Sequence, residues 1–305
     1  MATLVSVIVP FYGTAQSKQL ELVTESILLQ ERVNIDFIVA GLKEATRVRD
    51  LSDLSRHPKE TVPEIVRTGN IINNGLRLVK GDFTYITDAD ILLSNQYYLD
   101  GLVQESRGTG TSLKRPLMRR LLTQDFDWFY SMVALIGLKN SVASLDNSQE
   151  YIVKPIDEQR HMRVFPKFEN GKYKVFIASE SDFQEYISNE KNKGSEPRYF
   201  NQDRHCGAVF APTKDLVGIG GYHKGFISWG VLDADAQWKL ENRSGMKLIP
   251  NRKEFNVIHL DHKKGYFSKP KWEHDKKLQE RRRILGFEIC TREDIEDYSG
   301  GKNGR

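Results

Sequence analysis

Short apolar runs alternate with helix-like hydrophobic patterns along the first hundred residues. The apolar runs at 6–9 and 35–40 predict strands that are buried on both faces, as in a parallel sheet. Between them, apolar side chains recur every three or four residues, which predicts an amphipathic helix over 17–31. Residues 64–67 are a third candidate strand.

A second helix and a further strand continue the alternation. The helix is expected to stop at Gly81, and its predicted inner face consists of Ile71, Ile72, Gly75, Leu76 and Val79. The run 83–87 predicts a strand that leads directly into Asp88-Ala89-Asp90. The order of elements predicts an α/β fold with a Rossmann-like, mostly parallel sheet flanked by helices. Ligands of such sheets bind beyond the carboxyl ends of the strands, where residues 10–12 and 88–90 fall.

The rest of the chain is less regular. Residues 108–120 mix glycines with a basic cluster and indicate a loop or the start of a helical insert. A second structured block is expected over 207–260, followed by a basic helix over 270–285 and a disordered tail over 299–305.

Composition narrows the class of protein. The chain has 305 residues, of which 39% are hydrophobic and 28% charged, which is ordinary for a soluble globular protein that buries a full core. The sequence contains no apolar run of about 18 residues, so no transmembrane helix is expected. The apolar N-terminus lacks the basic region and the cleavage site of a signal peptide. Cys206 and Cys290 suit a reducing compartment, so we expect a cytoplasmic protein.

The net charge of +4 is local rather than global. Residues 252–305 contain 14 Lys and Arg and 10 Asp and Glu, which leaves 31 of each before them. A nucleic-acid binder spreads its basic charge over the body of the domain, and this chain does not. We interpret the basic helix over 270–285 as a solvated helix packed on the core. The alternative is peripheral contact with an anionic surface, such as the inner face of a membrane.

Asp88 and Asp90 are candidate metal ligands. Carboxylate oxygens at the end of a strand can hold Mg²⁺ or Mn²⁺, and the ion then bridges the oxygens of a diphosphate. The competing interpretation is a pair of solvated carboxylates in a loop.

Two segments carry a resemblance to family-2-like glycosyltransferases of GT-A type. One is the stretch 67–90, in which a helix leads through a glycine to a strand and the Asp-x-Asp, and the other is Ser6-Val-Ile-Val-Pro-Phe-Tyr12. The resemblance implies a GT-A fold in which Pro10 and Tyr12 line the uracil of a nucleotide and Arg67 reaches that nucleotide. By the same resemblance, Asp88 faces the ribose and the metal, and Asp90 ligates the metal.

One turn departs from this family. The second strand usually ends in an Asp-Asp-Gly-Ser-like turn that contacts the base, and here the turn is Val39-Ala40-Gly41-Leu42. Recognition of the base must therefore differ, with Glu44 as a candidate substitute.

A longer motif lies at 220–235. It resembles the galactosyltransferase-type sequence, in which Gly-Gly-aromatic precedes Trp-Gly-x-Glu-Asp-x-Asp. The resemblance implies that Gly207, Gly221, Trp229 and Gly230 serve the donor sugar and the acceptor. It also implies that Asp233 is the base that deprotonates an acceptor hydroxyl, which favours inversion.

Two features of this motif leave alternatives open. Leu232 replaces the usual Glu, so the acceptor is not defined by the motif. Acidic side chains at 233 and 235 also suit the first turn of a helix, where the helix dipole stabilises them.

His259 is expected to complete the metal site, with His262 as the alternative. In related glycosyltransferases a His after a late strand has this role, and neutral imidazole suits Mn²⁺ better than Mg²⁺. Lys263 or Lys264, in the segment that follows, could neutralise the leaving diphosphate as part of a lid.

The expected organisation is a GT-A catalytic domain over 1–262, followed by a basic lid and helical extension over 263–305. Within the domain, 1–100 is the nucleotide half and 200–262 the sugar and acceptor half. The expected activity is metal-dependent, inverting transfer of a hexose or N-acetylhexosamine from a UDP-sugar to a glycan, glycolipid or protein acceptor. The alternatives are a nucleotidyltransferase, whose glycine-rich phosphate loop PFYGTAQSK matches poorly, and a non-catalytic nucleotide-sugar-binding protein.

Overall fold

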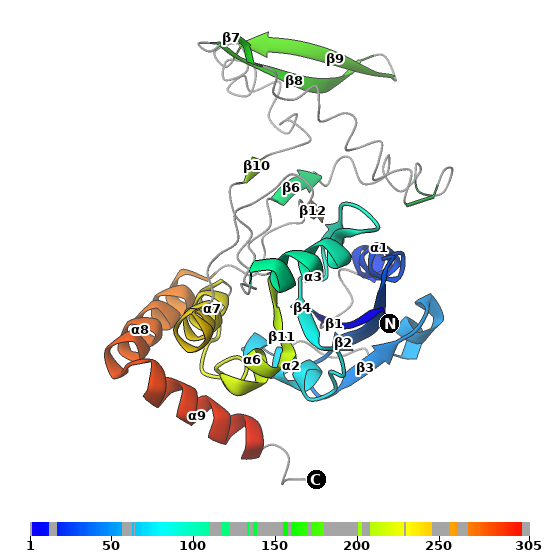
Figure 1. Ribbon diagram of the computed structural model, residues 1–305. Helices are drawn as coiled ribbons and strands as arrows, with labels where there is room; N and C mark the ends of the chain where they lie inside the picture. The colour runs from blue at the N-terminus through cyan, green and yellow to red at the C-terminus, as the bar shows by residue number, and fades with distance from the viewer. Residues whose placement is uncertain are drawn as a thin grey trace.

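The structure is a computed structural model of the chain (Figure 1). It describes residues 2–11, 17–56, 63, 65–109, 118–121, 133, 137–138, 155–157, 160–169, 172–179, 201–202, 208–228, 230–245, 257–260 and 268–300.

The main sheet has a parallel centre and antiparallel edges. Its five strands lie in the order β11 (Val209–Pro212), β4 (Phe83–Ile86), β1 (Thr3–Pro10), β2 (Val33–Ala40) and β3 (Ala45–Val48). The strand β1 pairs in parallel with β2 and β4, whereas β3 and β11 run antiparallel to their neighbours. The carboxyl ends of the three parallel strands therefore share one edge, as the sequence predicted.

Both faces of this sheet are covered, which explains the continuous apolar runs of β1 and β2. On one face, Val7 of β1 belongs to the apolar cluster that includes α1 (Ser17–Leu28). On the other face, Ile8 belongs to the cluster that includes α2 (Thr68–Leu76). A Cβ on Gly75 would meet the side chain of Ile8, so this glycine allows α2 to lie close to the sheet.

A second sheet continues from the end of β4. Its order is β10 (Asn201–Gln202), β6 (Met118–Leu121), β12 (Val257–Leu260) and β5 (Ile91–Leu93). Since β5 follows Asp90 directly and β12 pairs antiparallel with it, this sheet brings residues near 90 and 259 side by side.

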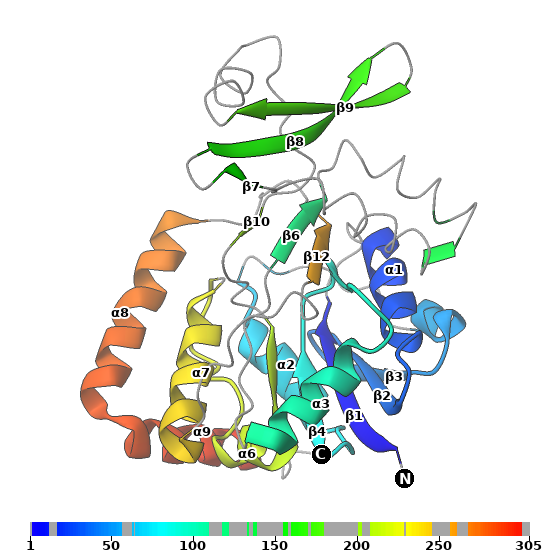
Figure 2. The same ribbon diagram turned by 45° about the horizontal axis from the view of Figure 1, so that its top comes forward.

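Several elements lie outside these two sheets. A third sheet has the order β7 (Pro155–Asp157), β8 (Arg160–Glu169) and β9 (Lys172–Ser179), and both views place it at the opposite end of the molecule from α9 (Figures 1 and 2). Two further elements of the first half of the chain are the 3₁₀ helix η1 (Leu51–Arg56) and the helix α3 (Tyr98–Thr109).

Helices from the second half of the chain gather on one side of the main sheet. They are α6 (Thr213–Gly218), α7 (Val231–Ser244), α8 (Lys269–Leu285) and α9 (Phe287–Gly300), and α1 lies on the other side (Figure 2). The helix α8 contacts both α7 and α9, so the helical extension is packed on the rest of the chain. Within the described residues, no helix is long and apolar enough to cross a membrane.

The predicted fold class is confirmed, and three local predictions are wrong. Residues 65–67 are not in a strand, and the neighbour of β2 is β3 instead. The helix α2 ends at Leu76, before Gly81. A Cβ on Gly81 would collide with the backbone of β1, so this glycine serves the approach to the sheet. The expected tail begins too early, because Ser299 lies within α9.

Candidate active site

Asp90 and His259 meet across two paired strands. His259 is opposite Ile91 in the β12–β5 pairing, and its Nε2 lies 3.5 Å from Oδ2 of Asp90. The backbone N–H of Leu260 donates a hydrogen bond of 2.7 Å to the carbonyl of Asp90, which fixes the register at this point. Both side chains are buried, and so is that of Asp88, which precedes Asp90 in the turn between β4 and β5.

The Asp90–His259 pair fits a divalent ion by donor type and spacing. Carboxylate oxygen and imidazole nitrogen both bind Mn²⁺. Bonds of about 2.1 Å separate two ligand atoms by about 3.0–4.2 Å, depending on the angle, and the observed separation lies within this range. In the described part of the chain, no three His, Cys, Asp or Glu side chains gather as a metal site. A pair of this kind leaves coordination positions for a bound ligand.

Tyr222 lies in the second motif, and its hydroxyl is affected by acidic residues of both motifs. Its side chain is fully enclosed, and burial, followed by the charges of Asp233 and then Asp88, raises the pKa of its hydroxyl well above 10. The negative charges of both carboxylates oppose ionisation of this hydroxyl. The hydroxyl stays protonated and has no hydrogen-bond partner among the described residues.

Asp233 lies in the first turn of α7, where it is 4% exposed. Gly230 precedes the helix with φ +88°, a conformation that L side chains rarely adopt, and a Cβ there would meet open space. The backbone, not crowding, therefore requires a glycine at the start of this helix. The dipole of α7 favours a negative charge at Asp233.

The Gly220-Gly221 turn is held by other parts of the protein. Gly221 has φ +66°, and a Cβ there would meet Oδ1 of Asn73. Asn73 accepts a hydrogen bond of 2.9 Å from the N–H of Tyr222 and donates one of 2.8 Å to its carbonyl. The motif of the second half is thus fastened to α2 of the first half. The close approach that these glycines allow is to the protein itself, with Gly220 against the backbone of α9.

Two of the predicted nucleotide-binding residues, Pro10 and Asp88, lie at or just beyond the carboxyl ends of the parallel strands, at the expected edge of the sheet. Pro10 ends β1 opposite Ala40 at the end of β2. Arg67 is exposed at the start of α2, and its guanidinium donates a hydrogen bond of 3.4 Å to the carbonyl of Lys224. At the departing turn, the N–H of Gly41 donates to the carbonyl of Glu44, which closes the β2–β3 connection.

A buried ionic cluster joins α7, the helix that carries Asp233, to α8 and α9. Arg282 of α8 donates to both carboxylate oxygens of Asp235, at 3.0 and 3.1 Å, and to Asp294 of α9, at 2.6 Å. Lys239 of α7 also donates to Asp294, at 2.6 Å. The Nδ1 of His223 lies 2.7 Å from the other oxygen of Asp294. The two cations therefore face two carboxylates, and His223 completes the set.

The cluster holds Asp294 in its charged form. Burial alone raises the pKa of this carboxyl, but the hydrogen bond from His223 and the charges of Lys239 and Arg282 outweigh burial and lower the pKa to about 2. The Nδ1 of His223 also lies 3.1 Å from a guanidinium nitrogen of Arg282. The ionic cluster fixes α8 and α9 against α7.

The sequence analysis missed some residues of this region, and some of the residues that it predicted cannot be placed. Asn73 and Arg282 were not singled out, because a polar residue inside a helix gives no local sign of its distant partner. Tyr12, Gly207, Trp229, His262 and the pair Lys263 and Lys264 lie outside the described residues, so their roles stay predictions.

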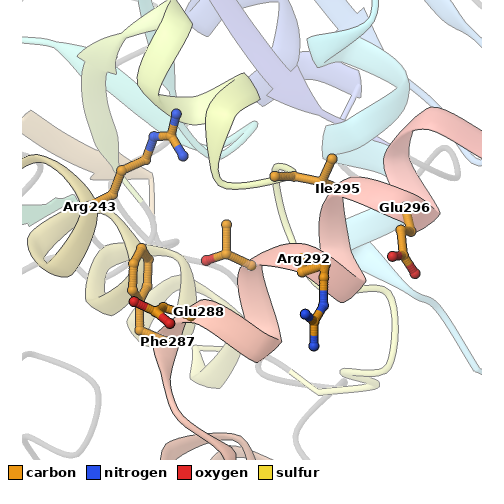
Figure 3. Close-up of a pocket in the computed structure, with 7 residues that line it drawn as sticks. Arg243, Phe287, Glu288, Arg292, Ile295 and Glu296 are labelled. Atoms are coloured by element: carbon orange, nitrogen blue, oxygen red, sulfur yellow. The ribbon is translucent and has the colours of Figure 1, made fainter.

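A shallow pocket lies elsewhere, along α9 and the end of α7 (Figure 3). Arg243, Phe287, Arg292 and Ile295 are among the residues that line it. None of the predicted site residues does, so this pocket is separate from the acidic motifs.

Comparison with known proteins shows similarity in fold. No protein-family model matches the sequence, and no curated protein matches it. The structure is similar to that of the mannosyltransferase PcManGT from Pyrobaculum calidifontis in complex with GDP-Man and Mn²⁺, with a TM-score of 0.50 and 15% identity over 97% of this chain and 70% of that chain. Another similar structure is the catalytic domain of Drosophila β1,4-galactosyltransferase 7 with xylobiose, with a TM-score of 0.43 and 11% identity over 90% and 79%.

These neighbours are glycosyltransferases, and this chain has a GT-A Rossmann-like α/β fold with a C-terminal helical extension. At 15% and 11% sequence identity, this similarity concerns the fold alone.

Proposed function

We propose that the protein is a metal-dependent, inverting glycosyltransferase that moves a hexose or N-acetylhexosamine from a nucleotide diphosphate sugar, UDP-linked in the first instance, to an acceptor hydroxyl. The observation that carries the proposal is the pairing of Asp90 with His259, together with the buried carboxylate of Asp233 in the first turn of α7. A protein that merely bound nucleotide sugars would need no buried carboxylate at Asp233 in addition.

In this proposal Asp233 is the catalytic base. Its carboxylate takes the proton of the acceptor hydroxyl, whose oxygen bonds to the anomeric carbon as the bond to the diphosphate breaks. Attack from the face opposite the leaving group inverts the configuration of that carbon. A positioned base of this kind contributes about 10²–10⁴-fold to the rate.

Asp90 and His259 are the proposed ligands of Mn²⁺ or Mg²⁺. Asp88, which does not gather with them as a third ligand in the described structure, is proposed to face the ribose and to join the metal site when the nucleotide binds. When bound, the ion supplies stabilisation for the negative charge of the departing diphosphate. The spacing of Asp90 and His259 supports this assignment, because it suits one ion held by both side chains.

The nucleotide is proposed to lie between Pro10, Tyr12 and Arg67. The position of Arg67 supports a role in nucleotide binding, because its side chain is exposed and contacts Lys224 of the second motif. The usual base-contacting turn is absent, and PcManGT was solved with GDP-Man. GDP-sugars therefore belong in the test beside UDP-sugars.

The acceptor side is proposed to comprise Gly207, Gly221, Trp229 and Gly230. Among them, Gly230 has the positive φ that sets the start of α7 before Asp233. A glycan, a glycolipid or a protein hydroxyl would serve as the acceptor.

A nucleotide-release assay tests the proposal. The full chain is incubated with Mn²⁺ and a panel of UDP- and GDP-sugars, and release of free UDP or GDP is measured with and without candidate sugar acceptors. We expect slow release by transfer to water from one class of donor, and none after chelation of the metal. Release of pyrophosphate from a sugar phosphate and a nucleoside triphosphate would instead identify a nucleotidyltransferase. Donor binding without any release would identify a binding protein.

A further inference from the structure

Side chains from several helices hold the connection between α6 and α7, which carries the second motif. Asn73 of α2 holds Tyr222, and Lys239 of α7 donates to the carbonyls of Ile219 and Gly221, at 3.1 and 2.8 Å. In α9, Asp297 pairs with Lys224 at 2.6 Å. Residues 227 and 228, the last described residues before Gly230, form their hydrogen bonds with α8.

That contact is made by Asp275, which is fully buried. The N–H of Ile227 donates to its two carboxylate oxygens, at 3.0 and 3.1 Å. The N–H and the hydroxyl of Ser228 donate to Oδ2, at 2.6 and 2.7 Å. Burying a carboxylate is costly unless hydrogen bonds compensate. Here the N–H groups and the hydroxyl of the loop supply them, and the Nδ1 of His274 also lies 3.1 Å from Oδ1.

The same helix holds the chain again just beyond Asp233. Arg282 lies seven positions after Asp275, two turns along α8 and on the same face. It grips Asp235 through both carboxylate oxygens. Thus α8 contacts the chain at residues 227 and 228, before α7 begins, and again at 235, within its first turns. Asp233 lies in the chain between these two contacts.

We propose that Asp275 is a positioning residue, and that α8 acts as a brace that sets the place and direction of Asp233 through the clamps at Asp275 and Arg282. This inference rests on the proposed role of Asp233 as the base. A displacement of about 1 Å at a reacting group can cost about 10²-fold in rate, so a brace at this point has a direct effect on turnover.

The clamp at Asp275 is the better one to test, because Arg282 also neutralises the buried carboxylate of Asp294. Asp275→Asn keeps the shape of the side chain but places an amide NH₂ against the donors of the loop. Ser228→Ala removes one of the hydrogen bonds and leaves Asp275 intact. Glu273→Gln is the matched control, since Glu273 is exposed on the same helix.

Two measurements are made on the full chain. The first is turnover of the donor that the nucleotide-release assay identifies. We expect Asp275→Asn to lower kcat at least tenfold with the KM for the donor within twofold of wild type, Ser228→Ala to lower kcat less, and Glu273→Gln to have no effect. An unchanged kcat in Asp275→Asn would overturn the proposal.

The second measurement is amide hydrogen exchange of the free protein, which needs no substrate. We expect Asp275→Asn to accelerate exchange at least tenfold in peptides that cover residues 226–235, with β1 and β4 unchanged. Equal exchange in wild type and variant, or acceleration spread over β1 and β4, would overturn the brace. If wild type releases no nucleotide from any donor, the proposed function fails, and the exchange result still decides whether α8 holds this segment. If Asp275→Asn does not fold, Ser228→Ala supplies both readouts.

Discussion

The imidazole of His259 and the carboxylate of Asp90 lie 3.5 Å apart on neighbouring antiparallel strands. If they share a metal ion, removing either ligand weakens binding of a nucleotide that depends on that ion. We expect Asp90→Ala to abolish the Mn²⁺-dependent part of UDP or GDP binding, measured by calorimetry with and without the metal.

Asp82→Asn is the control for this experiment, because Asp82 is exposed at the opposite end of β4. It should bind nucleotide as wild type does. Unchanged metal-dependent binding in Asp90→Ala would remove Asp90 from the metal site.

Asp233→Asn separates chemistry from binding. The amide cannot accept the acceptor proton, so we expect sugar transfer to fall by about 10²–10⁴-fold. Nucleotide binding should stay within about threefold of wild type, because Asp233 does not belong to the proposed nucleotide half. Glu241→Gln, on the same helix α7, should leave both properties unchanged. Transfer at the wild-type rate by Asp233→Asn would refute its role as the base.

Stability should fall in acid because of Asp294. Its pKa is about 2 in the folded protein, against an ordinary value of 3.8. A carboxyl with a lowered folded pKa stabilises the protein above its unfolded pKa, and this contribution disappears as the pH falls from 3.8 through 2. The contribution is about 2 kcal/mol.

The measurement is the free energy of unfolding in urea between pH 5 and pH 2, for wild type and for Asp294→Asn. The variant should be less stable at pH 5, since it leaves Arg282 and Lys239 with less compensation. It should also lose about 2 kcal/mol less than wild type as the pH falls. Parallel pH profiles would show that Asp294 titrates normally.

Gly220 and Gly230 allow strain and crowding to be separated. Both have positive φ, +73° and +88°, but a Cβ on Gly220 would also strike the backbone of Asp294 and Ile295. We expect Gly230→Ala to lower the free energy of unfolding by about 1–2 kcal/mol. Gly220→Ala should cost clearly more, as judged by urea denaturation. Equal losses of unfolding free energy in the two variants would mean that α9 moves away from the added Cβ at no energetic cost.

The outer face of α8 is expected to be solvated. Its inner face holds α7 through Arg282, so a truncation before α8 would disturb the fold and could not test membrane contact. Exposed Lys277 and Arg281 can be replaced together by Gln instead. We expect wild type and this variant to remain equally unbound in flotation with vesicles of anionic lipid. Flotation of wild type that the variant loses would support peripheral membrane contact.

Much of the first hundred residues was predictable. The runs at 6–9 and 35–40 are core strands, because burial on both faces requires continuous apolar residues. The run at 64–67 was wrongly predicted as a strand, because a short apolar stretch can also lie directly before a helix, here α2. The helix α9 was not predicted as a separate helix within the expected extension, because the residues that it buries include Thr291 and Asp294 and so form no apolar periodicity.

The sequence by itself determined β1, α1, β2, α2 and β4, since local periodicity decides where such elements form, and the residue types at the strand ends predicted the chemistry that follows them. It also indicated that Asp88, Asp90, Asp233 and His259 belong together, through a resemblance in motif. The tertiary structure alone decided that Asn73 clasps Tyr222 and that Asp275 and Arg282 grip the chain on either side of Asp233. Such contacts join residues far apart in the chain, and their geometry depends on which strands pair and which helix faces meet.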